Sequence, residues 1–380
     1  MATTRKASRY LVPVAVAGVA AATIGLVPAL AASGDPELPE ITAQQLIEKI
    51  AASETQTLSG TVKVETDLGL PSFAGLAGIG GSDAKSGTPS TDPTEKLTEL
   101  ASGTHTLRVA ADGPEKQRLT VLDGKDEYSL IHNGADVWAY DSTSGEAVHE
   151  KDATPHEKQR KEDLPGTPKE LADEVLKAAG TTTSITVDGT ARVAGRDAYQ
   201  LVIKPKQSGS TVESVKIAVD AQNGVPLKFT LASTSGGKAV LDAGFTKVDF
   251  AKPAADTFKV PEGAKVTEGE SKKDEPQADK LPKGLFGDMA GKNGKGPEVI
   301  GEGWTAVAAF DSGQPAPKTK DAPKEFQGFL DSLGDPVSGK FGSGTVFKTK
   351  LVNALMTDDG KVYVGAVTPD ALVKAANAAK

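Results

Sequence analysis

The sequence contains no cysteine among its 380 residues. This absence excludes disulfide bonds, thiolate metal sites, cysteine nucleophiles and any lipid anchor attached through a cysteine. Aromatic residues are scarce, at 5% of the chain, so each large aromatic side chain is a candidate for the core or for a binding surface. A chain of this length buries enough apolar surface to fold without crosslinks, in one large or two moderate domains.

Motifs for catalysis are also missing. The chain has no His-Glu-x-x-His helix, no calcium loop, no Gly-x-Ser-x-Gly serine elbow and no glycine fingerprint for a dinucleotide. The four histidines share no metal-ligand spacing: His105, His132, His149 and His156. We therefore predict a non-enzymatic protein that uses no metal and no cofactor. The net charge of −8, without a basic run past the N-terminus, argues against nucleic acid as a partner.

The N-terminus is typical of an export signal. Basic residues within 5–9 precede an uncharged apolar run at 11–30, and Ala29 and Ala31 are small residues at the two positions that a signal peptidase reads. We predict that residues 1–31 are a signal peptide and that the body of the protein is exported. The alternative is an uncut apolar run that spans the membrane and anchors the protein, because about 20 residues suffice to cross a bilayer.

Residues 193–226 are the most informative stretch of the body. Apolar and polar residues alternate in it with period two, and Asn223-Gly224 is a preferred turn dipeptide, so the pattern predicts consecutive antiparallel strands. An amphipathic helix is predicted at 41–53, where Thr42 and Gln45 have the spacing of a capping box. With the other alternating segments, these patterns predict an α+β fold built on a long antiparallel sheet.

A change in composition divides the body. Residues 262–283 are rich in Lys, Glu, Asp and Pro, which is typical of a solvated linker. Residues 146–167 are also hydrophilic, and 257–260 read as a short closing strand. The predicted organisation is a signal peptide at 1–31, a main domain at 40–265, a flexible linker at 266–296 and a small C-terminal α+β segment at 297–380.

Several short motifs, in their order, resemble the superfamily of the LolA and LolB lipoprotein carriers and the regulator RseB, also called MucB. They are the helix-to-strand entry LIEKIAASETQTLSGTVKVET at 46–66, NGADVWAYD at 133–141, VAGRDAYQLVIKP at 193–205, VDAQNGVPLKF at 219–229 and FTKVDFAKPAADTFKVPEGA at 245–264. The resemblance covers roughly residues 40–265, and with its long C-terminal segment the chain resembles an actinobacterial type of LolA-like exported protein. The resemblance implies an unclosed, strongly curved antiparallel β-barrel with helices plugging its concave face.

In that family the apolar chamber between sheet and helices holds acyl chains, so the resemblance implies a binding function. The candidates for the chamber wall are the apolar residues that alternate along the predicted strands: Val62, Val64, Leu107, Val109, Trp138, Tyr140, Tyr199, Leu201, Ile203, Phe229 and Leu231. The alternative is an ordinary packed core, since alternation does not distinguish a wall from a filled interior. The strand-borne arginines Arg108, Arg118 and Arg196 are expected to form surface salt bridges.

An apolar, glycine-rich loop at 68–81 is unusual, because loops that face water are normally polar. Leu70, Phe73, Leu76 and Ile79 are candidates for a mobile flap over the chamber or against a membrane; the alternative is a loop packed permanently into the core.

Three functions remain after these exclusions. The first is a carrier that holds acyl chains of a lipid or lipoprotein. The second is an RseB-like regulator that binds a membrane protein such as an anti-sigma factor, with the segment from Pro297 as its docking domain. The third is a structural envelope protein without a ligand. In each case we expect a monomer.

Overall fold

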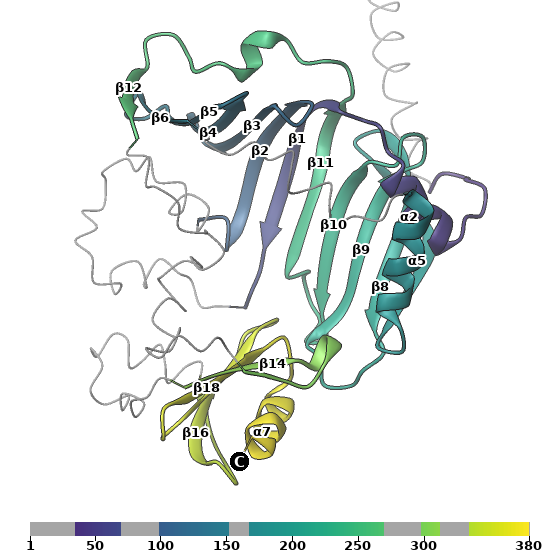
Figure 1. Cartoon of the computed structure of the whole chain (residues 1–380), viewed down its shortest axis with the longest axis vertical. Helices are drawn as coiled ribbons and strands as arrows, with labels where there is room; N and C mark the ends of the chain where they lie inside the picture. The colour runs from purple at the N-terminus through teal and green to yellow at the C-terminus, as the bar shows by residue number, and fades with distance from the viewer. Residues whose placement is uncertain (1–34, 70–98, 152–166, 270–297, 312–333, 380) are drawn as a thin grey trace, which may run out of the picture.

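The computed structural model describes residues 35–69, 99–151, 167–269, 298–311 and 334–379. These residues form a large sheet, a smaller C-terminal sheet and three α-helices (Figure 1). The helices are α2 (Ala43–Ala51), α5 (Pro168–Ala179) and α7 (Pro369–Ala378). Among the helices of these ranges, none has the length and apolar character needed to cross a membrane.

Local sequence explains where α2 and α5 begin. The Thr42 hydroxyl accepts a hydrogen bond from the Gln45 backbone, and the Gln45 side chain accepts one from the Thr42 backbone in return. Thr167 and Glu170 form the same reciprocal pair at α5. Each capping box satisfies two backbone N–H groups that a helix start leaves without partners. The capping box predicted at Thr42 is therefore confirmed.

The large sheet contains twelve strands in the order β12-β6-β5-β4-β3-β2-β1-β11-β10-β9-β8-β7. Their bounds are β1 Thr57–Thr66, β2 Gly103–Asp112, β3 Lys116–Asp123, β4 Asp126–Asn133, β5 Asp136–Asp141, β6 Glu146–Lys151, β7 Thr183–Val193, β8 Arg196–Pro205, β9 Val212–Asp220, β10 Pro226–Ser233, β11 Leu241–Asp249 and β12 Lys265–Glu268. All neighbours are antiparallel except β12, which pairs in parallel with β6. Because β7 and β12 are edge strands and do not pair with each other, the sheet is not closed.

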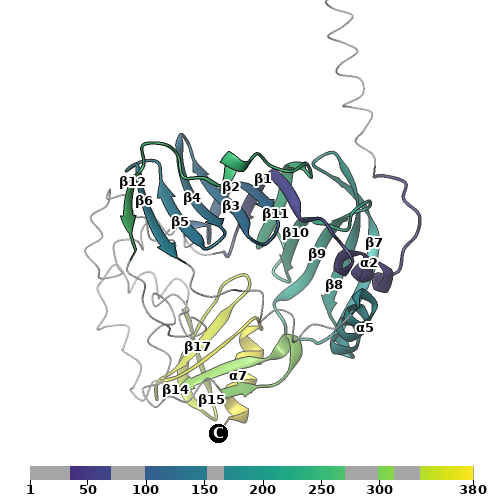
Figure 2. The same ribbon diagram turned by 45° about the horizontal axis from the view of Figure 1, so that its top comes forward.

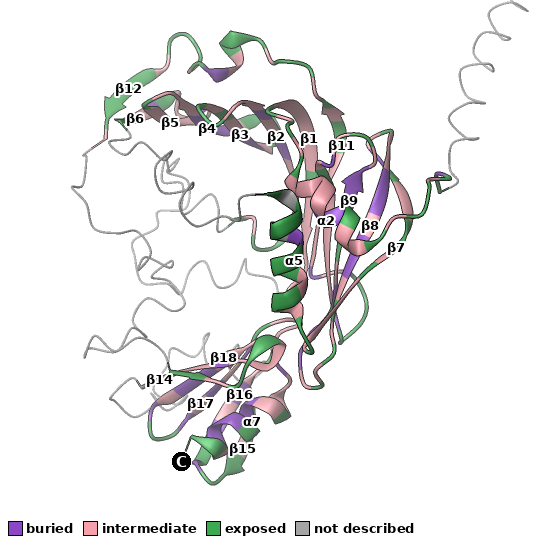
Figure 3. Ribbon diagram, turned by 45° about the vertical axis from the view of Figure 1, so that its right-hand side comes forward, coloured by how far each residue is buried: buried purple, intermediate pink, exposed green. Residues whose placement is uncertain are grey.

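The large sheet arches, and α2 and α5 lie on its concave side against β7 and β8 (Figures 2 and 3). Residues 250–264, which we call the strap, cross the convex side over β3 and β4 and contain the 3₁₀-helix η2 (Ala255–Phe258). Fold class and curvature therefore agree with the sequence expectation of an α+β protein with an unclosed, strongly curved sheet.

The C-terminal unit is a six-stranded sheet with α7 on one face. Its elements are β13 Glu298–Ile300, the 3₁₀-helix η4 Gly303–Thr305, β14 Val307–Asp311, β15 Gly334–Gly339, β16 Gly342–Phe347, β17 Asn353–Thr357 and β18 Lys361–Gly365. Its core is separate and fully apolar, with Val346, Leu355, Tyr363 and Leu372 nearly inaccessible to solvent. This unit can therefore be stabilised by its own hydrophobic cluster.

Hydrogen bonds join the C-terminal unit to strand ends of the large sheet. The Trp304 indole N–H donates to the Thr183 hydroxyl at 2.7 Å, next to the start of β7. Thr211 N–H donates to the Ala366 carbonyl at 3.0 Å, beside the start of β9. Lys350 forms an ion pair with Asp67, 2.5 Å between Nζ and Oδ2. The unit thus has a defined junction with the sheet.

Three local expectations differ from the structure. Residues 265–268, at the start of the expected linker, are strand β12, and the hydrophilic stretch from Glu146 begins with strand β6. Strand β12 is an edge strand with exposed side chains, and β6 lies next to it, so the alternating apolar signal is weak in this region. The short strand expected at 257–260 is wrong: Thr257 and Phe258 belong to η2, whose Phe258 side chain is buried against the convex face, and residues 259 and 260 are not in a strand.

Candidate ligand-binding face

Helices α2 and α5 cover one end of the concave face with a packed core. Leu46 of α2 and Ala172 of α5 are fully buried against Tyr199 and Leu201 of β8. The Tyr199 hydroxyl donates to the Pro39 carbonyl at 3.0 Å, so its polar end is satisfied. At this end of the sheet the predicted wall residues fill a core.

The same face continues across the sheet through direct cross-strand partners, which share one side of a pleated sheet. Leu201 lies opposite Ile217, Ile217 opposite Phe229, Phe229 opposite Ala243, and Ala243 opposite Val64. By this register, nine of the eleven predicted wall residues lie on the concave face: Val62, Val64, Leu107, Val109, Tyr199, Leu201, Ile203, Phe229 and Leu231.

Over β1–β5 the concave face carries a second apolar cluster. We call it the apolar face, and it consists of Val62, Val64, Leu107, Leu119, Val121, Tyr128, Leu130 and Ala139. Leu107, Val121 and Tyr128 are buried, whereas the others are half-buried. Sequence reasoning did not single out Leu119, Val121, Tyr128 and Leu130, although period-two alternation at 117–123 and 127–134 was a usable signal.

Trp138 and Tyr140 do not belong to this face, which corrects the sequence expectation. Within β5 it is Ala139 that faces Leu130 of the apolar face, and Trp138 faces Ile131 on the convex side. Because side chains alternate along a strand, one position of register moves the whole set to the other face. Alternation divided the side chains of β5 correctly into two sets, but it did not indicate which set faces the concave side of the sheet.

Trp138 stacks on His149, with ring centroids 3.9 Å apart. His149 is buried between two carboxylates: Nε2 lies 2.8 Å from Oδ1 of Asp136, and Nδ1 lies 3.0 Å from Oε2 of Glu268. Burial by itself lowers the pKa of His149, but the hydrogen bonds to Asp136 and Glu268 outweigh it and raise this pKa above its ordinary value. Since both ring nitrogens face acceptors, the imidazolium form suits the site, and it holds β12 against the sheet.

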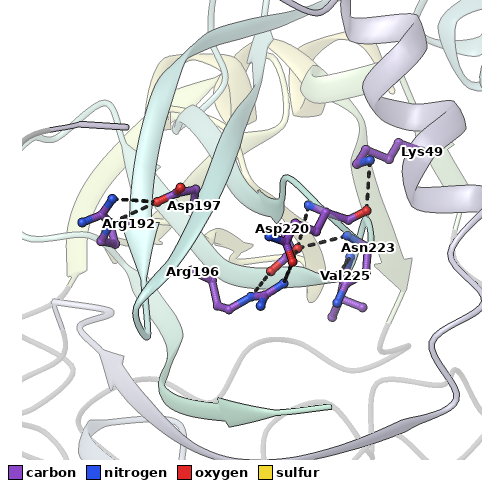
Figure 4. Close-up of polar contacts among 8 residues, drawn as sticks. Lys49, Arg192, Arg196, Asp197, Asp220, Asn223 and Val225 are labelled. Atoms are coloured by element: carbon purple, nitrogen blue, oxygen red, sulfur yellow. Dashed lines mark hydrogen bonds and ion pairs between the residues drawn. The ribbon is translucent and has the colours of Figure 1, made fainter. Parts of the chain in front are cut away.

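Arg196 and Asp220 form the most buried ion pair at the other end of the sheet (Figure 4). The Asp220 carboxylate is inaccessible to solvent and accepts from Arg196 Nε at 2.6 Å and Nη2 at 3.0 Å, and from the backbone N–H groups of Gln222 and Asn223. Burial alone raises the pKa of Asp220, yet these donors hold it below its ordinary value. The pair fixes the turn between β9 and β10.

The three strand-borne arginines were expected to form surface salt bridges, and they differ in how they meet this expectation. Arg108 is exposed and pairs with Glu127 at 2.8 Å, which confirms the expectation, and Arg196 pairs with a buried partner. Arg118 contradicts it: the side chain is half-buried and donates to neutral acceptors. The flap candidates Leu70, Phe73, Leu76 and Ile79 lie outside the described residues. Within the ranges that the structure covers, no cluster of acidic and histidine side chains is arranged to hold a metal ion.

The chemistry of the apolar face is limited to hydrophobic contact. Its side chains are hydrocarbon except for the hydroxyl of Tyr128, and Leu100 packs against it from outside the strands. Such a surface offers no nucleophile and no paired acid and base. It can bind through the burial of apolar area, at about 25 cal/mol for each Å².

An arched, unclosed antiparallel sheet with helices on part of its concave face is the architecture of LolA-like folds. Residues 98–264 match the family model described as the MucB/RseB N-terminal domain. The match covers less than half of the chain, and over these residues it confirms the resemblance to RseB (MucB) found in the motifs. The match runs from the segment before β2 to the end of the strap, and α2 and β1 precede it.

Solved structures are similar at low identity. The chain is 15% identical to the MucA/MucB complex of Pseudomonas aeruginosa, covering 88% of this chain and 96% of that one, with a TM-score of 0.40. A LolA superfamily protein of Nitrosomonas europaea is 12% identical over 58% of this chain and 98% of its own, with a TM-score of 0.22. An uncharacterized conserved protein of Thermus thermophilus is 12% identical over 60% and 99%, with a TM-score of 0.32. No curated protein matches the sequence.

Proposed function

We propose that this protein is an exported, non-enzymatic binding protein that holds acyl chains of a lipid or lipoprotein against its apolar face. One observation carries the proposal: the concave apolar surface extends past the helices. Helices α2 and α5 pack on β7 and β8, whereas the apolar face over β1–β5 has Leu100 as its only packing neighbour from outside the strands within the described ranges. A core built only by α2 and α5 would not require apolar residues this far along the concave face.

The energetics suit such a ligand. Each methylene group moved from water to an apolar surface contributes about 0.8 kcal/mol, so a chain of about ten methylenes supplies about 8 kcal/mol before the cost of ordering it. No charged contact is required for this, which agrees with the hydrocarbon character of the apolar face. Leu70, Phe73, Leu76 and Ile79 remain our candidates for an apolar flap over the bound chain.

A lipid-binding measurement tests the proposal. The protein is expressed from the full-length sequence and purified. One sample is extracted and its lipid content is measured by mass spectrometry, and a second sample is titrated with a fluorescent fatty acid. The double variant Val64→Lys, Leu130→Lys places two charges on half-buried positions of the apolar face and should lower affinity more than tenfold. The control, Val299→Lys, adds charge at an exposed position of the C-terminal unit and should bind normally.

Two results would overturn the proposal. One is an empty extract together with no uptake of fatty acid. The other is equal affinity for the double variant and the control, provided that circular dichroism shows both folded.

A second candidate function is regulation through a membrane partner such as an anti-sigma factor. The match to the MucB/RseB N-terminal domain supports it, and MucB of Pseudomonas aeruginosa has been solved in complex with MucA. The C-terminal unit would then be the docking domain, held to the sheet by Trp304 and Lys350. A partner captured from membranes by both the wild type and the Val64→Lys, Leu130→Lys variant would favour regulation, because a carrier would lose its cargo in the variant.

A further inference from the structure

A cavity of about 720 Å³ opens on the convex side of the sheet, opposite the apolar face. Strands β1, β2, β3 and β11 form its floor, and Thr257 of the strap forms part of its wall. Its charged lining residues are Arg108, Arg118, Lys247 and Asp249. Arg108 is paired with Glu127, which lies outside the lining, so Arg118 and Lys247 are the lining cations that form no ion pair among the described residues.

Arg118 is the most informative of these groups. Its guanidinium donates to the Thr120 hydroxyl at 3.2 Å, the Ser129 hydroxyl at 3.1 Å and the Thr257 carbonyl at 3.1 Å. All three acceptors are neutral, and a guanidinium has five N–H groups, so two of its donors have no acceptor among the described residues. No carboxylate of the described residues lies within ion-pair distance of Arg118 or Lys247. A half-buried cation without an anion is unfavourable unless a ligand supplies one.

The backbone is irregular at the same place. The register between β1 and β11 shifts between Thr61 and Val62, so that Thr61 faces Lys247 and Val62 faces Phe245. The extra residue, Thr246, donates its hydroxyl to the Thr61 carbonyl. Bulges of this kind redirect side chains and are common beside binding sites. Here the bulge lies directly next to a cavity cation.

We propose that this cavity binds a phosphoryl group of a small phosphorylated molecule or of a headgroup. Arginine and lysine around a compact space match the concentrated charge of a phosphate, and the hydroxyl-bearing residues Ser59 and Thr61 on the floor add donors. An acidic peptide is less suited. The floor strands are paired on both sides, so their backbones cannot accept an added strand.

The site is independent of the proposed acyl-binding function, because it lies on the other side of the sheet and uses none of the residues of the apolar face. Arg118 also contacts the strap at Thr257, so a bound anion would add a contact between strap and sheet. The cavity is larger than a phosphate ion, which leaves room for the group that carries the phosphate.

The test uses isothermal titration of the protein from the full-length sequence with glycerol phosphate, and flotation with vesicles of phosphatidylglycerol or of phosphatidylcholine. The double variant Arg108→Gln, Lys247→Gln removes two exposed cations without touching the strap anchor. We expect it to weaken glycerol phosphate binding at least about tenfold, because it removes two cationic hydrogen-bond donors from the cavity. Lys216→Gln, an exposed position on β9, is the matched control and should bind as the wild type does.

Every outcome bears on the proposal. If the protein binds glycerol phosphate but not phosphatidylglycerol vesicles, the result supports a small molecule as the source of the phosphoryl group. If it binds glycerol phosphate and phosphatidylglycerol vesicles, the result supports a lipid headgroup as the source. Absence of glycerol phosphate binding at low salt, or equal binding by the double variant and the control, overturns it. Binding of polyglutamate in preference to glycerol phosphate also overturns it, in favour of an acidic peptide.

Discussion

The two halves of the large sheet are covered on opposite faces. The half made of β7–β10 is covered on its concave side by α2 and α5, through apolar packing around Leu46, Tyr199 and Leu201. The half made of β1–β6, β11 and β12 is covered on its convex side by the strap, which is held by the buried Phe258 side chain and by polar contacts from Arg118 and Asn133. Both proposed binding features, the apolar face and the cationic cavity, therefore belong to the second half. Binding surfaces are found where cover is partial.

Removing the buried ion pair of Arg196 and Asp220 should have the largest effect on stability in the comparison of the two halves. Asp220→Ala leaves Arg196 without its inaccessible partner and removes acceptors for two backbone N–H groups, so we expect a loss of about 3–5 kcal/mol in the free energy of unfolding. Urea unfolding followed by circular dichroism measures it.

The neighbouring pair of Arg192 and Asp197, also drawn in Figure 4, provides the control because both side chains are more than one third exposed. Asp197→Ala should change stability by at most about 1 kcal/mol. Equal losses for the two variants would show that burial of Asp220 contributes nothing.

Substitution of the turn glycine Gly224 should have the next largest effect on stability. Gly224 has a φ of +76°, and an added Cβ would lie 2.4 Å from the Lys49 carbonyl oxygen in α2. We expect Gly224→Ala to cost about 2 kcal/mol or more, because it combines left-handed strain with displacement of the helix. Gly195→Ala has similar strain, with a φ of +78°, but no atom within 4 Å of the added Cβ, so it should cost about 1 kcal/mol. Identical unfolding midpoints would contradict the docking of this turn on α2.

The strap is a smaller and more local target. Arg118→Gln removes its bond to the Thr257 carbonyl, and hydrogen exchange within 255–260 should become several-fold faster while exchange in β8 is unchanged. The matched variant Arg192→Gln, in the other half, should leave the strap as it is. Faster exchange throughout the sheet would mean that Arg118 supports the whole fold.

The smallest expected effect depends on pH. The pKa of His149 is raised in the folded protein, so its stabilising contribution is fully present below the ordinary value of 6.5 and is lost as pH rises through the raised value. In a Trp304→Phe background, fluorescence of the stacked Trp138 should change with a midpoint above 6.5. Glu268→Gln should move this midpoint down, and a wild-type midpoint at or below 6.5 would refute the two-carboxylate arrangement.

Much of the fold could be predicted from sequence because its signals are local. Alternation at 193–226, the turn at Asn223-Gly224 and the capping box of Thr42 each depend on neighbouring residues, and each predicted element is present. The face on which a strand directs its residues is not local. Trp138 was placed on the wrong side because its position depends on pairing with β4 and β6.

The cationic cavity could not be predicted for a related reason. Arg108 and Lys247 are 139 positions apart in the sequence, and they come together only because β1 pairs with both β2 and β11. Likewise, no pattern in 265–268 indicates the parallel pairing of β12, which depends on the path of the strap. Sequence spacing reports residues that are neighbours along the chain, whereas these features depend on residues that are far apart in the sequence and adjacent in the fold.

The pairing of β1 with β11 also determines the order in which the sheet can assemble. Residues 57–66 can complete their pairing only after residues 241–249 are available. Closing so long a loop is slow compared with forming the hairpins on either side. As the chain is made from its N-terminus, one edge of β1 stays open until nearly all of the large sheet has been synthesised. During that interval the open edge can accept a foreign strand, so a chaperone that shields residues 57–66 would raise the folded yield more than one that shields any hairpin.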